Sequence, residues 1–108
     1  EVKIERGSKI VKCLTSGGAA VLHVWFECWH YVLLTGADEN HITLFDPYFY
    51  DEPFDNENIE VIQDAPTSMN RRVTYDVLNE EDDKFYAMGP KEDRKVILLY
   101  NLHMKKNA

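Results

Sequence analysis

The sequence predicts an α+β domain with a mostly antiparallel β-sheet and few short helices. Short runs rich in β-branched and aromatic residues recur along the chain, with turn residues between them. Only two short stretches have the pattern of a helix. The chain has 108 residues, of which 44% are hydrophobic and 12% aromatic, which is enough for a single core. We therefore expect residues 1–108 to form one domain.

The two helices are placed by their capping residues. The first is expected over residues 9–14, because Ser8 is a good N-cap and the glycines at 17–18 stop the helix. The second is expected within residues 72–79 and begins near Thr74. Both are short, so the sheet must supply most of the core.

The strands are placed by apolar runs and by the turns between them. After the first helix, the pattern predicts strands at 20–26, 29–36 and 41–45. Glu27 and Cys28 form a tight connection or a bulge, and the short acidic loop at 37–40 requires its flanking strands to pair antiparallel. Further along, we expect an edge strand at 59–62 and a hairpin that pairs 85–88 with 95–100.

Charge and composition exclude several classes of partner. The net charge of −7 and the pI near 5.0 disfavour binding to phosphate backbones and anionic lipid. The longest apolar stretch, residues 21–34, is interrupted by His23, Glu27 and His30, so it is too polar to span a bilayer. We expect no nucleic-acid partner and no membrane partner. With no visible signal peptide and only two cysteines, a reduced, cytoplasmic protein is the default expectation.

The most informative segment is the hairpin that contains His30 and Asp46. His30 stands at the start of one strand and Asp46 at the end of its antiparallel partner. Such a hairpin brings these ends together, about 5 Å apart at the backbone. A carboxylate beside an imidazole fixes its tautomer and stabilises the imidazolium, which gives the base and orienter of a catalytic triad. The alternative is that both are surface residues, with Asp46-Pro47 ending a strand.

The same hairpin resembles a known family. Its string His-Tyr-Val-Leu-Leu-Thr-Gly from His30, followed by a short acidic turn, an apolar strand and Asp-Pro at Asp46, is similar to the second half of papain-like cysteine peptidases. The most similar type is the bacterial family that cleaves double-glycine leader peptides from bacteriocins. The resemblance covers about residues 9–50. It implies the β-rich half of the papain-like fold, with His30 as general base and Asp46 as its orienter.

The chain departs from the family at the nucleophile. In the family, a Cys begins a long buried helix, and an oxyanion-hole Gln stands a few residues before it. Here no such segment is present, and the only glutamine, Gln63, follows the His–Asp pair. We therefore expect residues 1–108 to be the C-terminal portion of a larger peptidase-like domain, with the Cys encoded upstream. This portion alone is expected to be inactive.

The two cysteines of the chain have simpler interpretations. Cys13 is expected to pack as a small hydrophobe on the first helix. Cys28 is two residues before His30, so in an unbroken strand both would face the same side. Cys28 is thus an alternative nucleophile, although the family has its nucleophile on a helix.

Two further groups of residues could form a site, one of metal-capable side chains and one of aromatic residues. The metal-capable side chains lack the paired spacing of a zinc site, so we expect no metal and no cofactor; they are His23, Cys28, His30 and His41. The aromatic residues that follow Asp46-Pro47 are different, because they stand directly beside the His–Asp end. Tyr48 and Phe49 are therefore predicted to bind substrate.

These observations lead to one functional prediction and two alternatives. The predicted reaction is hydrolysis of a peptide or protein substrate by a cysteine peptidase-like domain, with His30 as base. One alternative is a non-catalytic peptide-binding or regulatory module that retains the fold, and another is a related acyl transfer such as amide synthesis. Loss of the family's helix would expose an apolar sheet face, which predicts a homodimer.

Overall fold

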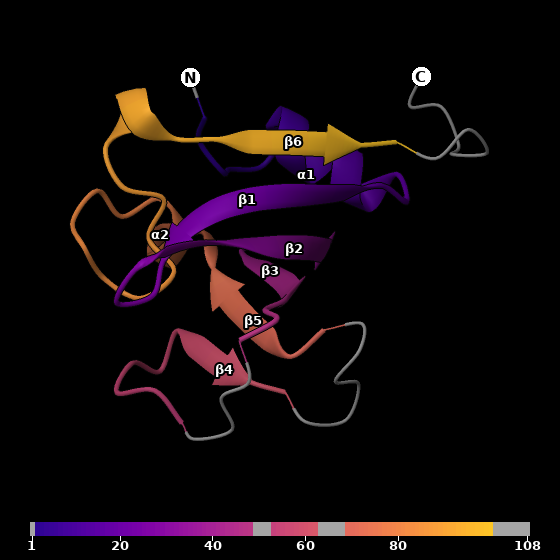
Figure 1. The fold of residues 1–108 in the computed structure, drawn as a ribbon. Coiled ribbons are helices and arrows are strands. Elements are labelled where there is room, and N and C mark those ends of the chain that lie inside the picture. Colours follow the sequence, from indigo (N-terminus) through magenta and orange to yellow (C-terminus); the bar gives the residue numbers. More distant parts are fainter. Residues whose placement is uncertain (1, 49–52, 63–68, 101–108) are drawn as a thin grey trace.

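The computed structural model describes residues 2–48, 53–62 and 69–100 and contains one six-stranded sheet (Figure 1). The strands lie in the order β4-β5-β3-β2-β1-β6, and each of their pairings is antiparallel. In chain order the elements are α1 (Lys9–Thr15), β1 (Ala19–Trp25), β2 (Trp29–Ala37), β3 (His41–Phe45), β4 (Ile59–Val61), β5 (Arg71–Thr74), α2 (Tyr75–Leu78), the 3-10 turn η1 (Lys91–Asp93) and β6 (Val96–Leu99). The predicted class, α+β with a mostly antiparallel sheet, is confirmed.

The three predicted strands that carry the site are all present. β1 and β2 form a hairpin in which Ala20 lies opposite Leu34 and Trp25 lies opposite Trp29, so only three residues connect the strands. Glu27, at the middle of this connection, has a positive φ of 61°, which lets the chain reverse within so few residues. This β1–β2 turn, residues 26–28, forms one end of the sheet.

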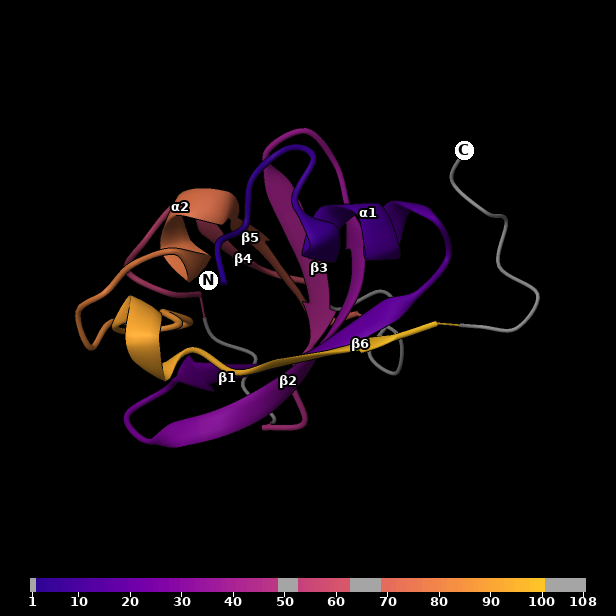
Figure 2. The same ribbon diagram turned by 90° about the horizontal axis from the view of Figure 1, so that it is seen from above.

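One face of the sheet forms the core. Alternate residues of β1, β2 and β3 are buried, as the period of a strand requires, and the helices supply the cover. Ser8 caps α1 as predicted, with its hydroxyl accepting a hydrogen bond from the backbone N–H of Val11 at 3.3 Å. Figure 2 shows α1 and α2 on the same side of β1 and β6.

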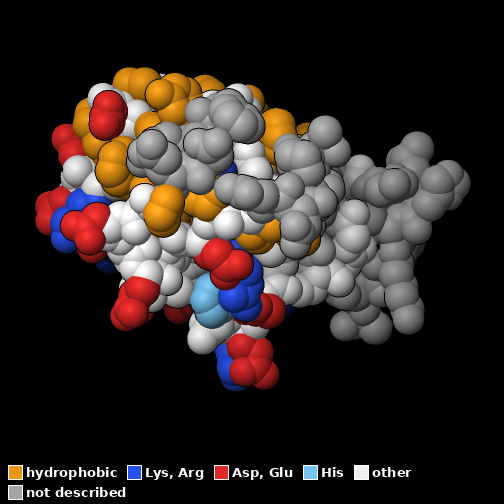
Figure 3. All heavy atoms as spheres, turned by 90° about the horizontal axis from the view of Figure 1, so that it is seen from below, with side chains coloured by type: hydrophobic (Ala, Val, Ile, Leu, Met, Phe, Trp, Pro, Cys, Tyr) orange, Lys and Arg blue, Asp and Glu red, His pale blue; other side chains and the backbone are white. Residues whose placement is uncertain are grey.

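The other face of these strands is apolar but exposed. Its side chains include Trp29 and Tyr31 of β2 and Ile97 and Leu99 of β6. Seen from below, most of the hydrophobic side chains in view gather toward the upper edge, whereas charged ones line the left and lower edges (Figure 3). Among the described residues, no helix is long and apolar enough to cross a membrane.

The second predicted helix is present, but it is shorter than the predicted segment and follows a strand that was not predicted. Residues 71–74 form β5, which lies between β3 and β4, and the helix α2 covers only Tyr75–Leu78. The predicted start near Thr74 is confirmed, because its hydroxyl accepts a hydrogen bond from Val77 N–H at 3.3 Å. Helix propensity did not decide the preceding residues, because pairing with β3 and β4 on both sides satisfies their backbone. The predicted edge strand at 59–62 is present as β4.

The predicted hairpin of 85–88 with 95–100 is wrong. β6 pairs with β1, where Val96 lies opposite Leu22, and residues 85–88 form no strand. Instead, this loop bonds to the end of β1: Tyr86 N–H donates to Trp25 C=O at 2.7 Å, and Trp25 N–H donates to Ala87 C=O at 2.9 Å. Tyr86 has a positive φ of 65°, which an extended strand cannot accommodate.

Candidate functional site

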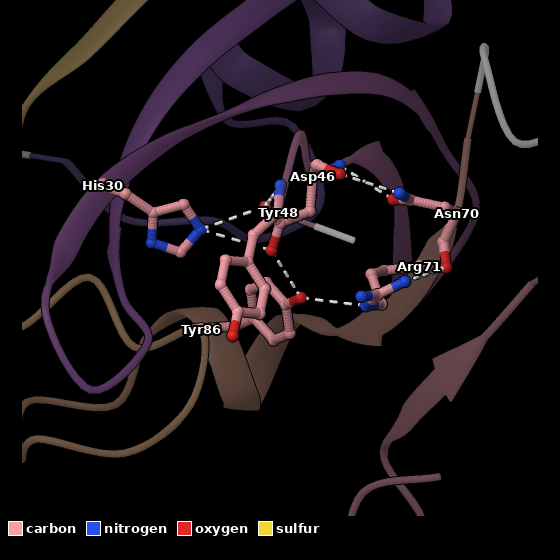
Figure 4. A network of polar contacts seen from close by, with 6 residues as sticks. All are labelled: His30, Asp46, Tyr48, Asn70, Arg71 and Tyr86. Carbon is pink, nitrogen blue, oxygen red and sulfur yellow. Dashed lines mark hydrogen bonds and ion pairs between the residues drawn. The ribbon is translucent and has the colours of Figure 1, made fainter. Parts of the chain in front are cut away.

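The structure brings His30 and Asp46 into contact (Figure 4). His30 Nε2 lies 3.1 Å from Asp46 Oδ1 and 3.2 Å from Oδ2. The imidazole is 21% exposed, whereas the carboxylate side chain is 0% exposed. The predicted contact between these two side chains is thus present, with a carboxylate withdrawn from water and a ring at the edge of solvent.

The contact is not a direct cross-strand pair. Pairing of β2 with β3 ends at Leu33 and Phe45, and a register shift lies between Leu34 and Gly36. His30 therefore lies three residues beyond the last paired residue of its strand. The predicted position opposite Asp46 in the ladder is corrected accordingly: the imidazole reaches the carboxylate from beyond the ladder.

Two further donors hold the carboxylate of Asp46. The backbone N–H of Tyr48 donates to Oδ1 at 2.9 Å, and the Tyr86 hydroxyl donates to Oδ2 at 2.7 Å. Each oxygen thus accepts a hydrogen bond from one of these donors in addition to facing the imidazole. Because a buried carboxylate is costly without such partners, these bonds are a condition for its burial.

Asn70 holds the backbone of Asp46. Asp46 N–H donates to Asn70 Oδ1 at 2.7 Å, and Asn70 Nδ2 donates to Asp46 C=O at 2.8 Å. The amide side chain thus satisfies both main-chain groups of Asp46, just past the end of β3. The backbone N–H of Asn70 donates to Leu44 C=O at 2.9 Å, which fixes Asn70 to the end of β3.

Arg71 and Tyr86 complete the network behind the carboxylate. Arg71 Nε donates to the Tyr86 hydroxyl at 2.9 Å, and Arg71 Nη1 donates to the Asn70 carbonyl at 2.8 Å. Burial raises the pKa of Tyr86 strongly, and its hydrogen bond to Asp46 raises it further. The phenol therefore keeps its proton at any physiological pH and acts there as a donor to Asp46.

A surface hollow of about 690 Å³ opens beside His30. Apart from His30 it is lined by Phe26, Glu27, Cys28, Tyr31, Pro47 and Tyr48. The Phe26 ring meets the imidazole edge to face with 5.7 Å between centroids, and it also contacts the Tyr48 ring at 5.0 Å. Tyr48 lines this hollow and is 56% exposed, but its role in substrate binding stays a prediction, and Phe49 lies outside the described residues.

Cys28 lines the hollow but does not lie on the strand with His30. It belongs to the β1–β2 turn, where its carbonyl accepts a hydrogen bond from Phe26 N–H at 2.8 Å. The premise of an unbroken strand through both residues is therefore wrong, although the thiol is exposed. Cys13 is buried, with its sulfur 3.6 Å from the carbonyls of Ala19 and Leu99, as expected for a small core residue.

The metal-capable side chains lie in different places. His23 stacks on Trp29 on the outer face of the sheet, with 4.9 Å between centroids, and His41 lies 3.5 Å from Asp38 at the other end of β3. Burial lowers the pKa of His23, and the charges of Lys95 and His30 lower it further. Among the described residues, no group of three or more His, Cys, Asp or Glu side chains could hold a metal ion.

Sequence reasoning missed three residues of the site: Asn70, Arg71 and Tyr86. Asn70 and Arg71 lie outside every predicted helix and strand, so nothing in the sequence marked them as partners of Asp46. Tyr86 stands in an apolar run of four residues, where a buried tyrosine is expected on packing grounds alone. No local signal distinguishes these residues, because their role depends on contacts between distant segments.

No protein-family model, no curated protein and no solved structure matches the chain. A function for the chain must therefore be inferred from the geometry of its own site.

Proposed function

We propose that the chain supplies the general base and the orienting carboxylate of a cysteine peptidase-like site. His30 is the base and Asp46 its orienter. The observation that carries this proposal is the bond of His30 Nε2 to both oxygens of a fully buried carboxylate. Nε2 is thereby occupied, and Nδ1 is buried and has no hydrogen-bond partner among the described residues. A histidine held in this way by one nitrogen can accept a proton with the other.

The chemistry would be hydrolysis of an amide through a thioester. Nδ1 of His30 takes the proton of a cysteine thiol, and the thiolate attacks the substrate carbonyl to form a carbon–sulfur bond. As the carbon–nitrogen bond breaks, the imidazolium returns the proton to the leaving amine. Water then gives a proton to His30 and forms a carbon–oxygen bond with the acyl carbon. As the carbon–sulfur bond breaks and the acid leaves, the imidazolium returns its proton to the thiolate and restores the thiol. Asp46 stabilises the imidazolium formed in each half of this cycle.

The proposal places the nucleophile on a segment outside residues 1–108. Within the chain, Cys13 is buried and Cys28 belongs to a turn. The hollow beside His30, with its largely apolar lining, is the place where such a segment and the substrate would meet the base. The substrate class is accordingly a peptide or a protein.

The test is thiol reactivity in the full-length polypeptide that contains this chain. Iodoacetamide labelling, measured by mass spectrometry at several pH values, should modify a cysteine outside residues 1–108 rapidly at neutral pH. The replacement His30→Ala should abolish this rapid reaction. His41→Ala is the matched control, because it removes a histidine of the same sheet that lies beside Asp38.

Either of two results would count against the peptidase proposal. One is labelling that becomes fast only near the pKa of a free thiol, about 8.5. The other is a rate that is equal in His30→Ala and in the wild type. A rapid, His30-dependent reaction of Cys28 would keep the base assignment but move the nucleophile into the turn.

A second candidate function is a non-catalytic module that binds a peptide. The exposed Tyr48 ring at an apolar hollow favours it, because an aromatic side chain so placed can contact a partner. Tyr48→Ala should weaken peptide binding while the fold is retained. Unchanged binding by a folded variant would exclude a role for this ring.

The exposed outer face of the sheet supports a further proposal, self-association. Trp29, Tyr31, Ile97 and Leu99 form an apolar surface on β2 and β6 that water would otherwise cover. We expect a homodimer through this face in solution. A single monomer mass in light scattering at working concentration would exclude it.

A further inference from the structure

Hydrogen bonds of fixed direction connect Arg71 with His30 through Tyr86 and Asp46, and the donors on both sides converge on Asp46 (Figure 4). A guanidinium can only donate, so in the bond between Arg71 Nε and the Tyr86 hydroxyl the oxygen is the acceptor. The phenol has a single proton, and it is directed to Asp46 Oδ2 at 2.7 Å. The orientation of the Tyr86 O–H bond is thus determined by the arginine behind it.

The same logic extends through the carboxylate to the imidazole. Asp46 accepts from Tyr86 on one oxygen and from Tyr48 N–H on the other, and an ionised carboxylate has no proton to give. His30 Nε2, which faces both oxygens, must therefore be the donor. The remaining nitrogen, Nδ1, is then left with its lone pair.

We propose that Arg71 and Tyr86 are positioning residues that place the proton of His30 on Nε2 and leave Nδ1 as the proton acceptor. This inference rests on the proposed function, because only a peptidase base needs Nδ1 of His30 free to accept a proton. Neither residue touches the imidazole, and both act through Asp46.

The burial of these groups supports a role beyond stability. Asp46, Arg71 and Tyr86 are all fully buried, yet Arg71 reaches Asp46 through the phenol. Buried charged pairs are often no more stable than apolar residues of the same size. The donors around Asp46 fix the orientation of a carboxylate behind a partly exposed histidine, which an apolar replacement could not do.

Loss of the phenol hydroxyl should make His30 more basic. Without it, Oδ2 loses a donor, and the negative charge of the carboxylate is shared with one partner fewer. The imidazolium then supplies a larger share of the stabilisation of the Asp46 charge, so the ring holds its added proton more tightly. One charge-assisted hydrogen bond corresponds to about a tenfold change in an equilibrium constant. Because this bond reaches Asp46 in both protonation states of the ring, only part of it acts on His30, and we expect the proton affinity to rise by at most about tenfold in Tyr86→Phe.

Other charged and titratable groups surround the ring, and the Tyr86 effect must be measured against them. They come from β1, from the β1–β2 turn, from the ends of β3 and β5 and from the loop after α2: His23, Glu27, Cys28, Asp46, Tyr48, Arg71 and Tyr86. All of them except the phenol hydroxyl are retained in Tyr86→Phe, so a changed proton affinity reports on that hydroxyl.

Nuclear magnetic resonance of ¹⁵N-labelled histidine tests the inference without any enzymatic activity. In the wild type, the nitrogen shifts should show neutral His30 protonated on Nε2. In Tyr86→Phe, the titration midpoint of the ring should rise measurably, with the tenfold change as the upper limit. Tyr75→Phe is the matched control, because it removes another buried hydroxyl, one that donates to Asp38 C=O. It should lower stability and leave the His30 midpoint where it was.

Neutral His30 with its proton on Nδ1, or a midpoint that Tyr86→Phe does not move, would overturn the inference. If Tyr86→Phe does not fold, 3-fluorotyrosine at position 86 preserves the packing and makes the phenol a stronger donor. This variant should lower the titration midpoint of His30. An unchanged midpoint would again refute the positioning role of Tyr86. If the resonance results hold but thiol labelling does not depend on His30, the proposed function fails while the positioning role of Arg71 and Tyr86 stands.

Discussion

Asn70 gives the sharpest test of how the site is held, because both side-chain hydrogen bonds it makes within the described part of the chain go to Asp46. Its amide accepts from Asp46 N–H at 2.7 Å and donates to Asp46 C=O at 2.8 Å. The replacement Asn70→Ala removes both bonds but leaves the backbone bond to Leu44 in place. It therefore measures what the two side-chain bonds to the backbone of Asp46 contribute to stability.

The size of the effect follows from these two bonds. Each neutral hydrogen bond contributes about 1 kcal/mol, so their loss should lower the free energy of unfolding by roughly 2 kcal/mol. For a domain of about 100 residues, each kcal/mol lowers the melting temperature by about 4–8 °C. We thus expect Asn70→Ala to melt about 10 °C below the wild type.

Thermal unfolding followed by circular dichroism measures this difference. Asn56→Ala is the control, because Asn56 makes one exposed, local bond to the N–H of Asn58 at 2.9 Å. It should cost less than about 0.5 kcal/mol. If Asn70→Ala and Asn56→Ala melt within about 2 °C of one another, the two side-chain bonds do not contribute as the geometry implies.

Three further predictions concern acid stability, packing and thiol access. Hydrogen bonds from a backbone amide and an arginine hold the pKa of Asp38 at about 2, below its ordinary 3.8. The stability this gives is complete above pH 3.8 and is lost as the pH falls toward 2, so urea unfolding of Asp38→Asn should show a shallower decline there. A Cβ on Gly18 would lie 2.6 Å from the Cys13 sulfur and 2.7 Å from a carbonyl oxygen, whereas one on Gly7 would meet nothing within 4 Å. Gly18→Ala should therefore cost roughly 2–3 kcal/mol and Gly7→Ala, strained at φ +76°, about 1 kcal/mol. Finally, iodoacetamide should modify the exposed Cys28 of the native chain and spare the buried Cys13.

Each of these three has a clear contrary result. An acid limb of equal slope in the wild type and Asp38→Asn would show that these hydrogen bonds do not stabilise the fold. Equal losses in the two glycine variants would mean that the close approach at Gly18 relaxes without cost. Modification of Cys13 in the folded chain would show that α1 opens readily from the sheet.

The strands that carry the site were accessible from the sequence. Residues 20–26, 29–36 and 41–45 combine apolar alternation with short turns, and the structure has β1, β2 and β3 there. The N-caps Ser8 and Thr74 were equally readable, because a cap bonds within three residues of itself. Where local pattern and local hydrogen bonds agree, the sequence alone predicts the element.

The remaining strands depended on partners far along the chain. Residues 71–74 form β5 because β3 and β4 flank them, and β6 pairs with β1 at the opposite end of the chain. The run at 85–88 has the composition of a strand, but its backbone turns at Tyr86 to bond the end of β1. Neither choice is encoded in the few residues concerned.

The same division applies to the site. His30 and Asp46 are 16 residues apart on one hairpin, so a turn and two strands predicted that their ends meet, although the imidazole reaches the carboxylate from beyond the ladder. Asn70 reaches Asp46 across 24 residues and Tyr86 across 40, and Arg71 donates to both Tyr86 and the Asn70 carbonyl. The sequence alone determined which imidazole meets which carboxylate, because short antiparallel pairing has few solutions. Only the tertiary structure decided which donors keep that carboxylate buried, since such donors can come from any segment that packs against it.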